Sequence, residues 1–186
     1  METVTHSLTP ATDAARALTG RSCGDCALCC KILDIVALEK PAGEWCKHCS
    51  THKKCDLYPN RPAKICDTFN CGYITQPGIP ESWFPGKSRM IVTTSADGQH
   101  VFLIVDPARP DAWRKDPYYQ HIKQWARTNN GTGKQIIVSI NKRYIVVFPD
   151  REVDLGTVGD DETVNFTVTQ TAIGPRTEAR KVKIAQ

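Results

Sequence analysis

Residues 23–30 read CGDCALCC, and residues 46–71 read CKHCSTHKKCDLYPNRPAKICDTFNC. These two stretches hold all nine cysteines of the 186-residue chain. Two cysteines separated by two residues can curl around one metal ion through a tight turn, so each such pair is typical of half of a tetrahedral thiolate site. A bound metal would also staple a region of about 50 residues, which is weak when held by its own apolar side chains alone.

Each of the nine thiols is a candidate metal ligand. An odd number of cysteines fits metal ligation better than complete disulfide pairing. Three cysteines at Cys-x2-Cys-x2-Cys spacing, with a distant fourth, also hold cubane iron–sulfur clusters, so the spacing does not separate zinc from an iron–sulfur cluster as the cofactor. The candidate ligands are Cys23, Cys26, Cys29, Cys30, Cys46, Cys49, Cys55, Cys66 and Cys71.

The adjacent cysteines Cys29 and Cys30 indicate more than one metal centre. Neighbouring side chains diverge on most backbones, so we expect these two thiols to serve different centres; the alternative is a strained vicinal disulfide. His48 and His52 could complete a mixed site, but with nine thiols at hand we expect them to be exposed or to surround the ligands. The number of centres and the grouping of ligands stay open.

The cellular compartment decides between metal and disulfide chemistry. The first 20 residues contain neither a continuous apolar stretch nor a basic start, unlike a secretory signal peptide. Nowhere else do about 18 apolar residues follow one another, so no membrane span is expected. We therefore expect a cytoplasmic protein with reduced thiols and no membrane partner.

The cysteine motifs also resemble a known family. They are Cys-x2-Cys-x2-Cys-Cys at residues 23–30, Trp-Cys-Lys-His-Cys at residues 45–49, and Tyr-Pro-Asn-Arg-Pro at residues 58–62 between the later cysteines. Over about residues 20–75 the chain resembles the cysteine-cluster family of zinc- or iron-chelating domains known as YkgJ or CxxCxxCC. The resemblance implies a metal-chelating module, and a relative, flagellin lysine-N-methylase, carries an iron–sulfur cluster. Many members of the family lack the ninth cysteine, Cys49.

Charge is consistent with metal-bound thiolates. The formal net charge of +4 counts every cysteine as neutral. Two tetrathiolate zinc centres would add about −2 each and leave the protein nearly neutral. We expect the basic side chains near the cysteines to compensate thiolate charge, although basic residues beside zinc knuckles also bind RNA. These side chains are Lys31, Lys40, Lys47, Lys53, Lys54, Arg61 and Lys64.

The second half of the sequence predicts an α+β domain with an antiparallel sheet and one main helix. One hairpin is expected around Asp97-Gly98 and another around Asn141-Lys142. Between them, Asp116 is expected to cap a helix whose first residue is Pro117, and a strand is expected at residues 163–169.

We divide the chain into five segments. They are an N-terminal extension, flexible or helical (1–20); the cysteine-cluster metal-chelating module (21–75); a Pro/Gly-rich connection (76–88); the α+β domain (89–170); and a basic C-terminal tail that is either flexible or an edge strand (171–186). No phosphate loop, dinucleotide fingerprint or nucleophile elbow occurs, so the catalytic residues are unknown and enzyme activity stays open. Asp106, Asp111 and Asp116 lie near prolines and are expected in turns or caps.

Three function classes remain. The first is a protein that chelates zinc or an iron–sulfur cluster through the nine cysteines, with a mainly structural metal and a protein partner. The second is an iron–sulfur redox or protein-modifying enzyme component, as the flagellin lysine-N-methylase relative implies. The third is a zinc-dependent adaptor that binds RNA or protein.

Overall fold

The computed structural model describes residues 18–57, 60, 66, 69–95, 98–172 and 174–184. Short helices come first: α2 (Leu28–Ile32), η1 (Val36–Leu38), α3 (Gly72–Thr75), η2 (Glu81–Trp83) and α4 (Pro85–Ser88). Strands β1 (Met90–Thr94) and β2 (Val101–Val105) follow, then η3 (Ala112–Arg114) and α5 (Tyr118–Thr128). The remaining strands are β3 (Ile136–Ile140), β4 (Arg143–Val147), β5 (Glu152–Thr157), β6 (Glu162–Thr171) and β7 (Gly174–Lys183). The predicted α+β class is confirmed.

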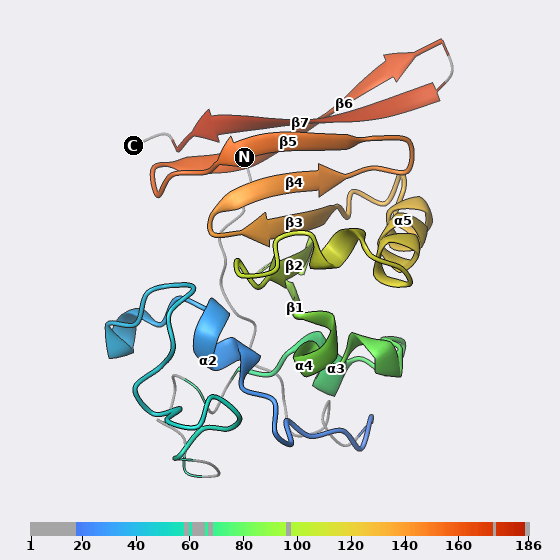
Figure 1. The fold of residues 1–186 in the computed structure, drawn as a ribbon. Coiled ribbons are helices and arrows are strands. Elements are labelled where there is room, and N and C mark those ends of the chain that lie inside the picture. Colours follow the sequence, from blue (N-terminus) through green and yellow to red (C-terminus); the bar gives the residue numbers. More distant parts are fainter. Residues whose placement is uncertain are drawn as a thin grey trace.

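The main sheet has five strands in the order β1-β2-β3-β4-β5 (Figure 1). Both predicted hairpins form, since β1 pairs antiparallel with β2 and β3 antiparallel with β4. The turn between β3 and β4 uses Asn141 and Lys142, both with positive φ, which suits a two-residue hairpin. One pair differs from the expected antiparallel pattern: β2 and β3 run parallel, because the chain crosses over through η3 and α5 between them.

Alternating side chains give the sheet two apolar faces. Leu103, Val138 and Ile145 belong to one core, and their strand neighbours Phe102 and Ile137 belong to the other. Helix α5 covers the first face (Figure 1). The β6–β7 hairpin covers the second face, where Val164 and Ala179 pack into the same cluster as Phe102.

Two expectations about the second half need correction. Helix α5 begins at Tyr118 rather than at Pro117, and Asp116 does not cap it, because Pro117 occupies the cap position and its side chain accepts no hydrogen bond. The Pro/Gly-rich connection is not wholly irregular, since it includes η2 and α4. Of the two alternatives for the C-terminal tail, the structure has the strand, since residues 174–183 form β7 and pair with β6.

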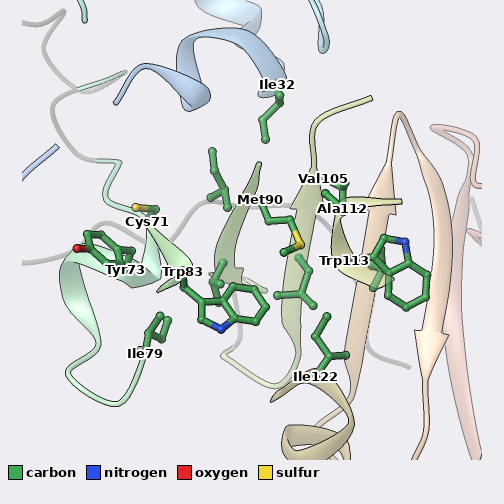
Figure 2. Packing of buried hydrophobic residues seen from close by; sticks show 14 of the residues in the cluster. Ile32, Cys71, Tyr73, Ile79, Trp83, Met90, Val105, Ala112, Trp113 and Ile122 are labelled. Atoms are coloured by element: carbon green, nitrogen blue, oxygen red, sulfur yellow. The ribbon is translucent and has the colours of Figure 1, made fainter. Parts of the chain in front are cut away.

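The cysteine-bearing segments pack against the β1 side of the sheet. We call the described residues from 21 to 75 the cysteine region. Its helices α2 and α3 contact β1, and so does α4 from the connection. Figure 2 shows Ile32 pointing from α2 towards the sheet. Cys71 and Tyr73 belong to the same apolar cluster as Trp83 and Met90. One apolar cluster therefore joins the cysteine region to the sheet. The N-terminal extension as far as residue 17 lies outside the described residues.

Candidate metal centre

A tight turn and the short helix α2 present the first four cysteines. The backbone N–H of Cys26 donates to the Cys23 carbonyl oxygen at 2.8 Å, and Gly24 supplies the positive φ that this turn requires. Cys29 and Cys30 then lie within α2. All nine cysteines lie among the described residues, and each carries a free thiol.

Four cysteines line one pocket and form what we call the first group: Cys23, Cys26, Cys29 and Cys71. Cys71 comes from the start of α3, 42 residues after Cys29 in the sequence. Aromatic and apolar side chains, including Phe69, Tyr73 and Phe84, complete the wall. The pocket thus gathers the Cys-x2-Cys-x2-Cys triad and one distant cysteine.

Burial favours the neutral thiol form at two members of the first group, Cys71 and Cys26. It raises the pKa of Cys71 to about 12, and the thiols of Cys23 and Cys26 raise it further, against the backbone N–H groups of Ile74 and Tyr73. The pKa of Cys26 is also raised, chiefly by burial. Since the thiolate is the ligand form, a cation in the pocket would have to supply the stabilisation that the protein alone does not.

A second group consists of Cys30, Cys46, Cys49 and Cys55. The Cys46 N–H donates to the Cys30 carbonyl at 2.8 Å, and the Cys49 N–H to the Cys46 carbonyl at 3.0 Å. Cys49 is 1% exposed and packs with Cys46 and Cys30 in a small separate cluster. Burial raises its pKa to about 12, and the charges of Cys30 and Cys55 add to the shift. The Cys49 thiol donates to the backbone carbonyl of Lys54, the residue before Cys55, at 3.2 Å.

The two groups adjoin at Cys29 and Cys30. A hydrogen bond between their thiols is the largest cause of the raised pKa of Cys30, followed by burial. Their packing partners nevertheless differ, because Cys29 lies against the core shared with the sheet and Cys30 against Cys46 and Cys49. These adjacent residues therefore belong to different but neighbouring groups.

The remaining candidates are Cys66, His48 and His52. Cys66 is half-buried, and most residues around it in the sequence lie outside the described part of the chain. His52 stacks on Trp45 at 4.3 Å between ring centroids, and His48 is half-buried. Arg61 and Lys64 lie outside the described residues.

The donor chemistry suits a soft metal, but the thiols do not form a closed coordination sphere. Among the residues that the structure describes, no three His, Cys, Asp or Glu side chains converge closely enough to hold one ion. Thiolate sulfur is the donor that zinc and iron–sulfur clusters share. The cysteines are thus gathered into two neighbourhoods, and the side chains would have to move to close around a metal.

The ammonium groups of two lysines near the thiols bind oxygen atoms. Lys40 is 5% exposed, and its Nζ donates to the backbone carbonyls of Lys31 and Leu33. Burial lowers its pKa, while the thiols of Cys46 and Cys30 act in the opposite direction. Lys31 Nζ lies 2.7 Å from Asp106 Oδ1.

Asp106 and Gly86 were missed as residues that support the cysteines. Asp106 does make the expected turn contact, accepting the Ala108 N–H, but it also pairs with Lys31 and Arg89. Burial raises the pKa of Asp106, and these three hydrogen bonds outweigh burial, so that the net shift is downward. The Gly86 backbone N–H lowers the pKa of Cys26. Neither contact has a local sequence signal, because both partners are distant along the chain.

Comparison of the chain with family models, curated proteins and solved structures gives no match. The resemblance to the cysteine-cluster family therefore stays a prediction. In the part of the chain that the structure describes, no helix has both the length and the apolar character needed to cross a membrane.

Proposed function

We propose that this chain is a metal-binding protein that chelates zinc or an iron–sulfur cluster through its nine-cysteine region, with a mainly structural role for the metal. The observation that carries the proposal is the first group, in which Cys23, Cys26, Cys29 and Cys71 line one pocket. Four sulfur donors are the usual complement of a structural zinc site and of a cubane cluster. The proposal places the protein in the cytoplasm, where thiols stay reduced.

The architecture of the cysteine region supports a structural role. Its α-helices α2 and α3 are five and four residues long, too short to be stable by themselves. A metal that binds the folded region and not the unfolded chain contributes its binding free energy to folding. Metal binding at both cysteine groups would fix the loops between the short helices. The metal would then have a structural role, and the sheet would be the part that contacts a protein partner.

The iron–sulfur alternative has its own support. The three cysteines of the first group that are close in sequence have the spacing of a cubane cluster, and the pocket places the distant Cys71 with them. Backbone N–H groups near Cys26 and Cys71 are of the kind that tune a cluster's potential. The RNA-binding alternative is weaker, because Lys40 is buried and Lys31 is paired with Asp106.

The test is anaerobic purification of the full chain, followed by elemental analysis, acid-labile sulfide determination and a visible spectrum. Zinc in a colourless protein, or iron with sulfide and broad visible absorption, is the expected result. The Cys26→Ser and Cys71→Ser variants should contain less metal than the wild type. A folded wild-type protein that contains neither metal, and takes up neither under reducing conditions, would overturn the proposal.

A further inference from the structure

Asp106 is a buried carboxylate at the junction between the sheet and the cysteine region. It directly follows β2 and its side chain is 0% exposed. Its oxygens accept hydrogen bonds from Lys31 Nζ at 2.7 Å, from the Ala108 N–H at 3.0 Å, and from the Arg89 guanidinium. Its own N–H donates to the Arg89 carbonyl at 2.9 Å, so the backbone at this point is fixed by the β1–β2 pair.

Lys31 connects Asp106 to the cysteine region. It directly follows Cys30 in α2, and its side chain is 13% exposed. Its backbone carbonyl accepts the Gly43 N–H at 3.0 Å and Lys40 Nζ at 2.7 Å. Its ammonium group also lies 5.9 Å from the ring centroid of Trp45, the residue before Cys46. Lys31 therefore links α2, the helix that carries Cys30, both to Asp106 and to the segment that leads into Cys46.

Those two segments are also joined to each other. The Cys46 N–H donates to the Cys30 carbonyl, so the position of α2 sets the position of the Cys46–Cys49 turn. A buried ion pair is costly to break from one side, because the charge left behind loses its partner without regaining water. The Asp106–Lys31 pair consequently holds α2 against the end of the sheet in one arrangement.

We propose that Asp106, acting through Lys31, is a positioning residue for the second cysteine group and so controls metal affinity there. This inference rests on the proposed function. Residues that orient metal ligands without touching the metal typically change affinity by about 10- to 100-fold when they are replaced. The first group depends on this contact less, because only Cys29 among its members lies in α2, whereas Cys23 and Cys26 are held by their own turn and Cys71 by its place at the start of α3.

Cobalt(II) added to the full chain under anaerobic conditions tests this, since thiolate-to-cobalt absorption reports sulfur ligation directly. Cys71→Ser weakens the first group and Cys49→Ser weakens the second, so each background reports chiefly on the other group. Asp106→Asn should weaken cobalt binding about 10- to 100-fold in the Cys71→Ser background, and much less in the Cys49→Ser background. Asp154→Asn is the control, because Asp154 pairs with Arg143 on the exposed surface of β5 and β4.

A second set of variants keeps the test decisive if Asp106→Asn folds poorly. Lys31→Met should reproduce the loss of affinity at the second group, and Lys31→Arg should restore most of it by keeping the ion pair. Lys47→Met is the matched control, since Lys47 is an exposed lysine beside Cys46. Equal losses at both groups, or unchanged affinity in Lys31→Met, would overturn the inference. A wild-type protein that binds no cobalt through sulfur would instead overturn the proposed function.

Discussion

The cysteine region and the sheet are held together by different means. In the sheet, five strands satisfy one another's backbone groups, and two apolar cores cover its faces. In the cysteine region, the longest helix has five residues, and the region carries nine thiols, eight of them in two groups. Strand pairing and two apolar cores stabilise the sheet, whereas the cysteine region depends on packing against the sheet and, in our proposal, on a metal.

The largest expected contrast between the two regions is their response to metal removal. In the metal-loaded protein, a strong chelator should raise amide hydrogen exchange in the loops around Cys46 and Cys49 by roughly a hundredfold or more, because their folding depends on the metal. Amides of β3 and β4 should stay protected. Hydrogen exchange read by mass spectrometry measures the loops and the strands in one experiment. Equal protection in the two regions after chelation would contradict the expected difference between them.

The next largest effect is expected in the core of the sheet. Phe102 is fully buried and packs edge-to-face on Tyr144 at 5.9 Å between ring centroids. Phe102→Ala should lower the free energy of unfolding by about 3–5 kcal/mol, because it removes a large buried side chain and leaves a cavity. Urea denaturation followed by circular dichroism measures this loss. Metal content per folded chain should not change, and a loss of metal in the folded variant would show that the two regions are not separable.

The core of the sheet should contribute its own alkaline pH dependence through Tyr144. The pKa of Tyr144 is raised, mainly by burial and secondarily by the charge of Asp160. A phenol whose pKa is higher in the folded protein contributes no destabilisation below its ordinary pKa of 10.0, and costs stability as the pH rises above that value. The wild type should therefore lose more stability than Tyr144→Phe between pH 9 and 11, where unfolding is followed in urea. Parallel pH profiles would contradict this.

The smallest effects are expected at exposed apolar side chains in both regions. Val36 in η1 is 81% exposed, and Val168 in β6 is 65% exposed. Val36→Thr and Val168→Thr should each change the free energy of unfolding by no more than about 0.5 kcal/mol. A larger loss for Val36→Thr would indicate that the cysteine region packs against something at this point, and thermal melting of the two variants side by side would detect it.

Local signals in the sequence were sufficient to predict most strands of the sheet, but they did not predict how all of the strands are connected and paired. The hairpins were predictable because Asn141-Lys142 and Asp97-Gly98 mark turns between apolar runs. The parallel pairing of β2 with β3 was not, because it depends on a crossover through α5 rather than on any local pattern. Strand β5 was missed because none of its residues is buried and it contains Gly156, so its sequence lacks a clear apolar alternation.

For the candidate site, sequence spacing identified the thiols but not their surroundings. The pairing of Cys71 with the first three cysteines follows from the packing of α3 on β1, which spacing does not encode. The roles of Asp106 and Gly86 depend on contacts between segments more than 50 residues apart. Such contacts become visible only when the sheet and the cysteine region are seen together.

The most direct test of the central claim is X-ray absorption at the metal edge of anaerobically purified full-chain protein. The account predicts that zinc or iron is bound and that its nearest neighbours are sulfur, at about 2.3 Å. The Cys71→Ser and Cys49→Ser variants should each reduce the metal content. A first shell of oxygen and nitrogen, or a folded protein without metal, would contradict the claim that the cysteine groups are metal centres.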